Sequence, residues 1–477
     1  MEKLEKTQNT KSPISLRQLI ATIVFLGVFF IPFSSFESIP FLGEFSREAS
    51  AFFFFLAFLL IVVFSFINEK ISIPFNNLLF QIVLLFLGWF LITTLINIPT
   101  INNYYFKGIS GFERFIRQYA VLLISGLFFL LTYYNVFRNY NNKELFYKIR
   151  RVFLYSMIVV TSYAILEILI LKFRMTFLTN IIQGFNYFPF TEVNLDFIRL
   201  RISSVTFEAP ALATYLFTVA GWMFSYIITE KGFKRFIPAL ATITLALFSD
   251  SRAGLLIIFI QIIVFAILLI RKKKHHKLFI RIFKLTTVIV LLIGIFKGKE
   301  ITTHLIEKVN SFDLADGQHS ISNRSRFGIQ YANYLVFLEN PLIGVGYGQQ
   351  AYEAKSKYPN WAAVNNWEFR LKYLNQSDSK FPPGYNLYTR ILAEGGIIGM
   401  IIFIFLVALI LMTCYAIIKK NDDRYILAIV ILISIIGFLF NWLKMDTIRV
   451  FGFWINLAIL IKLTSNGTTF IFNNSKK

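Results

Sequence analysis

Residues 322–348 read SNRSRFGIQYANYLVFLENPLIGVGYG, and they lie in the one long polar segment, roughly 297–388, of an otherwise very apolar chain. Two arginines, Arg324 and Arg326, stand at the start of this stretch. On both sides of the polar segment, the sequence consists mostly of apolar blocks of about the length that crosses a bilayer. The stretch therefore predicts a membrane protein with one extramembrane insertion.

The middle of the stretch predicts a helix that ends in a glycine-rich turn. Apolar side chains recur there at helical spacing, at Tyr331, Tyr334, Leu335 and Leu338. Pro341 ends this helix, because proline disfavours helical geometry in the residue before it. Gly344, Gly346 and Gly348 then permit a tight backbone path that larger residues would block. Fixed cations, an aromatic helix face and a glycine turn together suit an anionic, lipid-linked sugar.

The composition predicts an all-α polytopic membrane protein. The chain has 477 residues, of which 56% are hydrophobic. Apolar blocks predict about twelve transmembrane helices, near 18–36, 49–67, 77–97, 115–137, 152–171, 209–229, 236–249, 253–270, 279–296, 395–417, 425–441 and 449–463. We expect three parts: helices one to nine in 1–296, a large outer loop in 297–394, and helices ten to twelve with a cytoplasmic tail in 395–477.

The distribution of basic residues predicts the orientation in the membrane. A net charge of +22 would suggest a nucleic-acid partner for a soluble protein. In a membrane protein, lysine and arginine collect in short cytoplasmic loops, and the strongest such run is 271–274. This pattern predicts cytoplasmic termini and an outer insertion, with no nucleic-acid partner. The span at 18–36 has no small-residue cleavage site, so we expect a retained helix.

The outer segments carry an unusual number of arginines, which are the candidate anion-binding residues: Arg199, Arg201, Arg252, Arg324, Arg326 and Arg390. Arginine stays charged and forks onto phosphate oxygens. For any single one of them, contact with a lipid headgroup or capping of a helix is favoured over a catalytic role. Several on one outer face favour an anion site.

Other chemistry is sparse in the sequence. There is no metal-ligand cluster, since Asp250 stands alone and Asp313 and Asp316 lack a third ligand. There is no nucleotide-binding motif either, so we predict no cofactor and no metal. Glu208 and Glu394 lie at membrane edges, where an acid suggests function or a pair with an outer arginine.

Aromatic residues of the insertion leave three interpretations open. They could pack a small core, face the lipid headgroups or stack on sugar rings. The set comprises Tyr347, Tyr352, Tyr358, Trp361, Trp367, Phe369, Tyr373 and Phe381. His304 and His319 are the two outer histidines, and exposed loop positions suit them better than a role as catalytic base.

Four segments resemble the O-antigen ligase and polymerase superfamily, the Wzy-type enzymes. They are RISSVTFEAP at 201–210, LFSDSRAG at 247–254, Ser325-Arg326 followed by PLIGVG at 341–346, and YNLYTRILAEGGIIG at 385–399. They occur in the family's order, with the large outer loop in the family's place. One position departs from the pattern: this chain has Tyr385 where ligases have a histidine.

The resemblance implies a GT-C-like glycosyltransferase that uses undecaprenyl-diphosphate-linked oligosaccharide at the outer face of the bacterial cytoplasmic membrane. It implies catalytic roles for Arg201, Arg326, Glu208 and Tyr385, and substrate binding by Arg199, Arg252, Arg324, Asn386, Arg390 and Tyr347. Because tyrosine is protonated at neutral pH and makes a poor base, Tyr385 favours a polymerase over a ligase. A chain-length regulator and a flippase of the same pathway are expected partners, beside membrane lipid.

Three rival functions stay open. A ligase would transfer the lipid-linked polysaccharide to another acceptor, such as lipid A-core. An exporter or flippase of the same lipid-linked sugars would need polar residues through the membrane core, and the sequence has few. A secondary transporter would show broken helices in two related halves, and no internal repeat is evident.

Overall fold

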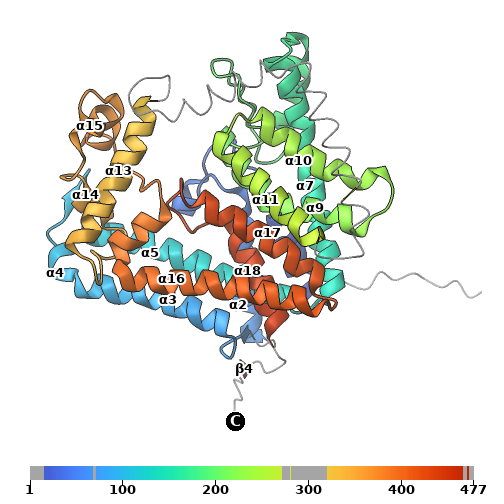
Figure 1. Cartoon of the computed structure of the whole chain (residues 1–477), viewed down its shortest axis with the longest axis horizontal. Coiled ribbons are helices and arrows are strands. Elements are labelled where there is room, and N and C mark those ends of the chain that lie inside the picture. Colours follow the sequence, from blue (N-terminus) through green and yellow to red (C-terminus); the bar gives the residue numbers. More distant parts are fainter. Residues whose placement is uncertain (1–15, 68–70, 271–279, 281–319, 466–469, 472–477) are drawn as a thin grey trace, which may run out of the picture.

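The structure is a computed structural model that describes residues 16–67, 71–270, 280, 320–465 and 470–471 (Figure 1). Several sequence predictions lie outside these residues. They are the basic run 271–274, nearly all of the ninth span at 279–296, and the acids and histidines at Asp313, Asp316, His304 and His319.

The described residues are mostly helical, and each expected apolar span within them coincides with a helix. These helices are α1 (Leu16–Phe29), α2 (Ala49–Ile67), α3 (Leu78–Ile96), α5 (Gly111–Leu123), α6 (Leu130–Phe137), α7 (Asn142–Leu171), α9 (Ala209–Thr229), α10 (Ile237–Phe248), α11 (Arg252–Ile270), α16 (Leu387–Lys420), α17 (Tyr425–Asn441) and α18 (Phe451–Thr464). A π-helical segment, Ile124–Phe129, joins α5 to α6 in one continuous helix.

Six of these helices are long and apolar enough to cross a membrane: α3, α5 continued through α6, α7, α9, α11 and α16. Shorter apolar helices are α1, the apolar part of α2, α17 and α18. The 12 residues of α10 extend roughly 18 Å, less than the roughly 30 Å of a hydrocarbon core. The fold is thus that of an all-α membrane protein, and the number of twelve spans stays a prediction.

Several helices begin or end away from the sequence prediction because of capping residues and prolines. Asn141 accepts from the backbone of Glu144, so α7 begins ten residues before the expected span at 152. Asn386 caps α16 in the same way, so this helix begins at Leu387 rather than at 395. In contrast, α1 ends at Phe29, three residues before Pro32.

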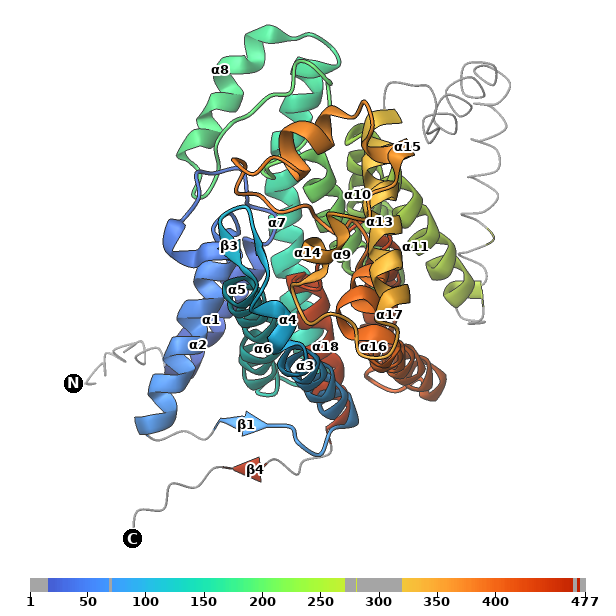
Figure 2. The same ribbon diagram turned by 90° about the vertical axis from the view of Figure 1, so that its left-hand side faces the viewer.

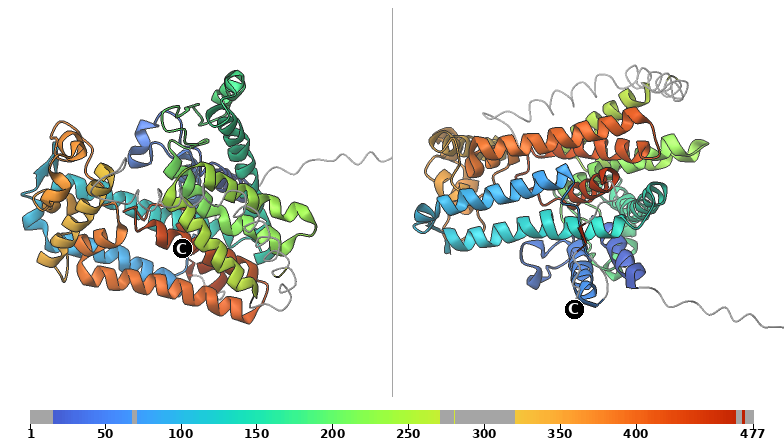
Figure 3. Two further views of the ribbon diagram at one scale, coloured as in Figure 1. Left: turned by 45° about the horizontal axis from the view of Figure 1, so that its top comes forward. Right: turned by 90° about the horizontal axis from the view of Figure 1, so that it is seen from below.

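The long helices pack side by side around α16 and α17. Helix α16 packs against α3, α17 and α13 (Ser320–Glu339), and α17 packs against α9 and α11. Figure 3 shows α3, α5 and α16 running roughly parallel, with α17 beside α16. A single large apolar core contains most of the buried side chains of these helices.

The short elements gather at the two ends of the helix bundle. At one end lie η1 (Pro40–Phe45), α4 (Ile98–Ile101), the hairpin β2–β3 (Tyr105–Phe106 and Ile109–Ser110), α8 (Thr179–Ile182), α14 (Gln350–Ala354) and α15 (Asn360–Ala363). At the opposite end, β1 (Ser72–Ile73) pairs antiparallel with β4 (Phe470–Ile471) (Figure 2). The first end therefore carries the described part of the predicted outer insertion, and we call it the outer end.

Some aromatic residues of the insertion pack a small core, as the first interpretation predicts, and others are exposed. Phe369 and Tyr373 are buried and form a small core with Ile329 of α13 and Ala362. Trp361 and Trp367, by contrast, are 45% and 42% exposed. Part of the set therefore packs the outer segment, and the tryptophans are free to meet solvent, headgroups or sugars.

The glycine turn after α13 is a docking element that is fixed to α16. The backbone N–H of Val345 donates to the Ala393 carbonyl at 2.9 Å, and that of Ile397 donates to the Pro341 carbonyl at 2.8 Å. Gly344 has a φ of +69°, and a Cβ there would lie 2.5 Å from the Glu394 carbonyl carbon. Small residues are required here because two backbones meet.

Helix α3 and its C-cap residue Asn97 donate hydrogen bonds to two backbone carbonyl groups of this junction. Trp89 donates to the Gly395 carbonyl at 2.8 Å, and Asn97 donates to the Gly344 carbonyl at 3.1 Å. The two side chains lie eight residues apart, which is the same face of a helix. These hydrogen bonds hold α3, the turn after α13 and α16 together beneath the outer segment.

Candidate active site

A cluster of cations that includes the acid Glu208 lies at the outer end of the bundle, next to a second acid, Asp250, whose charge acts on Arg252, and we call it the cation cluster. It comprises Arg199, Arg201, Glu208, Arg252, Arg326 and Lys444. Arg326 projects from α13 and is exposed. Its charge acts on Glu208, Lys444 and Arg252, and that of Arg201 acts on Arg252. The structure therefore brings together residues from four segments of the chain, the first and last of which lie 245 positions apart.

Electrostatics make this cluster receptive to an anion. Burial raises the pKa of the Glu208 carboxyl above its ordinary value, and the charges of Arg326, Lys444 and Arg199 lower it in part. Burial and the charge of Arg326 lower the pKa of the Lys444 ammonium to about 8. Cations that repel one another in a partly desolvated site gain stability when a phosphate binds between them.

The loop that carries Arg199, Arg201 and Glu208 is fixed to α7. Buried Glu167 of α7 accepts from the backbone N–H of Ser203 at 3.0 Å and of Ser204 at 2.8 Å. Ser204, in the left-handed region at a φ of +53°, donates through its hydroxyl to the Val160 carbonyl at 2.8 Å. Both oxygens of one carboxylate thus hold the loop before α9.

Tyr385 lies beside the cation cluster. Its ring centroid is 5.5 Å from the Arg326 guanidinium carbon, and its hydroxyl is 2.6 Å from that of Tyr373. Burial raises the pKa of both tyrosines above the ordinary value. The pair therefore stays protonated at neutral pH and can donate a hydrogen bond, but it cannot act as a base.

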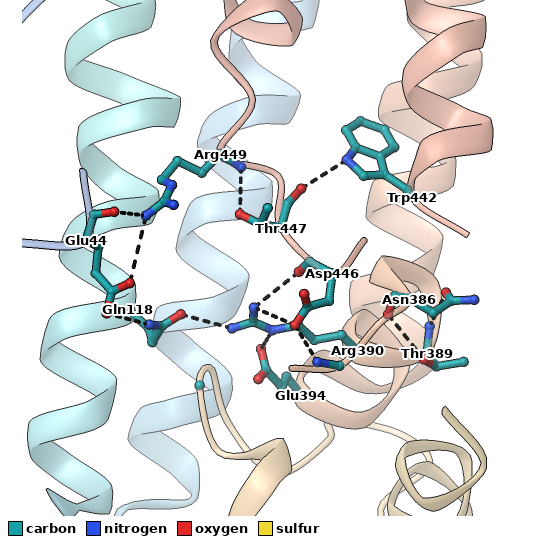
Figure 4. Close-up of polar contacts among 12 residues, drawn as sticks. Glu44, Gln118, Asn386, Thr389, Arg390, Glu394, Trp442, Asp446, Thr447 and Arg449 are labelled. Carbon is teal, nitrogen blue, oxygen red and sulfur yellow. Dashed lines mark hydrogen bonds and ion pairs between the residues drawn. The ribbon is translucent and has the colours of Figure 1, made fainter. Parts of the chain in front are cut away.

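Arg390 belongs to a second network, in which its charge is already neutralised (Figure 4). Its Nε donates to Glu394 at 3.1 Å, Nη1 to the Asp446 carbonyl at 3.2 Å, and Nη2 to Gln118 at 3.3 Å. The guanidinium also lies 5.4 Å from the ring centroid of Tyr347. This network ties α16 to α5 and to the loop after α17.

Asn386 performs a structural task next to these residues. Its side-chain oxygen accepts from the backbone N–H of Tyr388 at 2.9 Å and of Thr389 at 3.2 Å, which caps α16. Its amide donates to Gln330 of α13 at 3.4 Å. Asn386 therefore fixes where α16 begins relative to α13.

Comparison with known proteins identifies part of the chain. A family model for O-antigen ligase matches residues 237–404. We call this matched region, about a third of the chain, the O-antigen ligase domain. No curated protein matches the chain. The O-antigen ligase domain contains Arg252, Arg326 and Tyr385, and it indicates a membrane enzyme of polysaccharide synthesis.

The cation cluster joins the O-antigen ligase domain to residues outside it. Arg199, Arg201 and Glu208 precede the domain, and Lys444 follows it. Arg324, inside the domain, is two residues from Arg326 on α13, so the two side chains leave the helix on different sides. Arg324 is half-buried, and the cation cluster described above does not include it.

Three residues of this region are not among the predicted site residues: Lys444, Asp446 and Glu167. Lys444 and Asp446 lie in a short loop between two apolar blocks, and charges in such a loop are a signal for a site at the end of the helices. Glu167 is an acid within an apolar span, and such an acid is a functional suspect by default. That signal was available in the sequence.

Within the described ranges, no group of three or more histidine, cysteine, aspartate or glutamate residues is placed to hold a metal ion. The positive charge of the cation cluster comes instead from its arginines and Lys444. Independence from metal remains a prediction to be tested.

Proposed function

We propose that this protein polymerises undecaprenyl-diphosphate-linked oligosaccharide at the outer face of the bacterial cytoplasmic membrane. The cation cluster supports the proposal most directly, because it offers four arginines and a lysine at the end of an apolar helix bundle, where the charges of two acids, Glu208 and Asp250, only partly balance them. A lipid diphosphate has the charge to bind these cations and the hydrocarbon chain to remain in the bilayer.

In the reaction, a hydroxyl group of the acceptor sugar attacks the anomeric carbon of the donor sugar. The bond between that carbon and the phosphate oxygen breaks, and undecaprenyl diphosphate leaves with the bonding electrons. Arg326 and Arg201 would bind the departing diphosphate, because arginine forks onto phosphate oxygens. Cations that are fixed before the reaction stabilise the charge that develops on the leaving group.

The acceptor hydroxyl must also lose a proton. Glu208 is the acid of the cation cluster, and the neighbouring cations favour its charged form. We assign it the role of general base. Tyr385, held protonated by burial, would orient a sugar hydroxyl by donating a hydrogen bond.

Tyr385 is the residue that favours a polymerase over a ligase. The resemblance places a histidine at the position of Tyr385 in ligases, and a tyrosine with a raised pKa cannot replace a histidine base. The description of the matched family as an O-antigen ligase favours the second candidate, transfer of the finished polysaccharide to a different acceptor.

Conservative substitutions test the role of the two arginines in cells. Arg326→Lys and Arg201→Lys keep the charge but lose the planar fork. Loss of a transition-state contact of ~3 kcal/mol predicts turnover about a hundredfold slower. The measurement is polymer length on a gel, together with the abundance of the protein in membranes.

Arg370→Lys is the matched control, because Arg370 is an exposed arginine of the same outer segment. We expect long polymer from this control and single-repeat product from the other two variants at normal abundance. Long polymer from Arg326→Lys and Arg201→Lys would refute the assigned roles.

A further inference from the structure

A second cationic site lies on the other side of Tyr385 from the cation cluster. A cavity of about 580 Å³, which we call the outer cavity, is lined by Tyr385, Arg114, Arg117 and Lys380, among others. Its volume falls in the roughly 300–1,000 Å³ range of ligand pockets. Tyr385 therefore contacts Arg326 on one side and borders this cavity on the other.

Not all cations of the outer cavity are engaged within the protein. Arg390 gives its donors to Glu394, Asp446 and Gln118 and is neutralised. In contrast, among the described residues, the ion pair of Arg117 is an exposed one at 3.6 Å with Glu113 on the same helix, a type of contact that contributes little. Lys372 and Lys380 are exposed at the rim. The lining also includes the acids Glu44, Asp378 and Asp446, so its five cations exceed its acids by two, and the cavity offers a net positive charge to an anionic ligand.

Arg114 is held in place for such a ligand. Its Nε donates to the Gly348 carbonyl at 2.7 Å, and its guanidinium lies 3.6 Å from the ring centroid of Phe381. The stacking fixes the plane of the guanidinium. Arg114 and Arg117 lie three residues apart on α5, so they lie on one side of that helix.

An apolar groove opens from the outer cavity toward the membrane-facing surface. The groove has a volume of about 520 Å³, and it shares Glu44 and Arg117 with the outer cavity. Phe55 and Leu59 line it one turn apart on α2, and Val121 of α5 and Ile124 of the π-helical segment line it on the other side. From Arg117 to Ile124, the continuous helix rises roughly 10 Å toward the middle of the bundle.

The groove and the cavity together match one kind of molecule. The charged end at Arg117 continues directly into apolar walls, and Leu59 and Phe41 are 57% and 77% exposed there. A molecule with a multiply charged anionic head and a long hydrocarbon chain would place its head at the charged end and its chain between the apolar walls. Glu44 at the junction accepts from Gln118 at 3.5 Å and pairs with Arg449, which reduces its negative charge at the entrance.

We infer that the outer cavity and the groove bind a second polyisoprenyl-diphosphate-linked saccharide, with its isoprenoid chain in the groove and its diphosphate at Arg114 and Arg117. This inference rests on the proposed function and assigns the acceptor of the polymerase. The donor occupies the cation cluster, and the two saccharides meet at Tyr385. An enzyme with two lipid-diphosphate sites joins two copies of one type of substrate, as a polymerase does.

The number of bound probe molecules tests this inference on the full chain in neutral detergent. The probe is farnesyl diphosphate, counted on the intact protein by native mass spectrometry. We expect two bound molecules in the wild type and one in Arg117→Glu, whose second-site affinity should fall about ten- to a hundredfold. Val121→Trp, which fills the groove without a charge change, should also bind one. Arg326→Ala should lose the other molecule, and Lys355→Ala, an exposed control, should bind two.

Different outcomes overturn different claims. Two molecules bound to both Arg117→Glu and Val121→Trp would refute the second site and leave the proposed function intact. The second site would also be refuted if the wild type bound one molecule and only Arg326→Ala lost it. If phosphatidylglycerol displaced the bound probe from the groove as readily as added farnesyl diphosphate did, the groove would be an ordinary lipid site. No binding to the wild type would contradict both proposals.

Discussion

Lys444 shows how a single residue acquires its properties from the fold. The sequence places it in a short loop after an apolar span, where it resembles any loop lysine. In the structure it lies near Arg326 and Glu208, and burial lowers its pKa to about 8. Its charge is therefore present at neutral pH and lost under mildly alkaline conditions.

This pKa predicts a pH dependence of diphosphate binding. A bound anion favours the protonated lysine, so binding is tight below pH 8 and weakens as pH rises through that value. The protonated fraction falls from about nine-tenths at pH 7 to about one-tenth at pH 9. We expect affinity for farnesyl diphosphate at the cation cluster to fall about five- to tenfold over this interval, measured by isothermal titration calorimetry in Arg117→Glu protein.

Lys444→Arg in the same Arg117→Glu background is the control, because arginine keeps its charge throughout this range. The phosphate groups of the ligand lose their last proton near pH 6, so they do not titrate between pH 7 and 9. We expect a nearly flat profile for Lys444→Arg. The same decline with and without the substitution would show that Lys444 is not the titrating group.

At the scale of elements, Glu167 is a positioning residue for the arginine loop. Replacement by alanine leaves the backbone N–H groups of Ser203 and Ser204 without their acceptor in a buried place. Each such loss costs roughly 1–3 kcal/mol. We expect Glu167→Ala to lower the midpoint of thermal unfolding and to lower polymer synthesis per folded molecule at least about tenfold.

Glu167→Gln separates a positioning role from simple stability. The amide keeps one acceptor oxygen, so part of the loop anchor and part of the activity should return. Thr161→Ala on the same helix serves as a control for small changes in α7, since its hydroxyl makes no hydrogen bond within the described residues. If the folded fraction of Glu167→Ala polymerises at the wild-type rate, the positioning role is wrong.

The glycine turn shows what the sequence can and cannot predict. Gly344, Gly346 and Gly348 predicted a tight backbone path, which we interpreted as suited to an anionic substrate. In the structure, this turn bonds to the backbone of α16 where Gly396 breaks helical geometry at a φ of +64°. The sequence indicates that small residues are needed, but only the packing of α13 on α16 shows what they accommodate.

At the scale of the whole molecule, the orientation in the membrane is a prediction with a direct test. The native Cys414 is fully buried in α16, so it should not react with a polar thiol reagent. Ser379→Cys lies exposed in the outer segment, and Lys143→Cys lies exposed at the start of α7. In whole cells, a membrane-impermeant reagent should label the first and spare the second until the membrane is permeabilised. Labelling of Lys143→Cys alone would invert the orientation.

Hydropathy sufficed to predict the helices, because each apolar block must become a helix to satisfy its backbone in lipid. The arginines of the cation cluster were also found from their residue type and outer position. The contacts themselves could not be predicted. Arg390 forms an ion pair with Asp446, which lies 56 residues away, and donates a hydrogen bond to Gln118, which lies 272 residues away. No local pattern encodes such pairs.

The central claim is polymerisation of a lipid-linked saccharide by the cation cluster without a metal ion, and reconstitution tests it most directly. The purified protein in liposomes receives a synthetic undecaprenyl-diphosphate-linked repeat unit as its only substrate, with EDTA and without nucleotide. We predict lipid-linked chains that grow by whole repeats, with one undecaprenyl diphosphate released per bond, and no growth with Arg326→Lys protein. A substrate that stays at one repeat, or grows only after magnesium or manganese is added, would contradict the account.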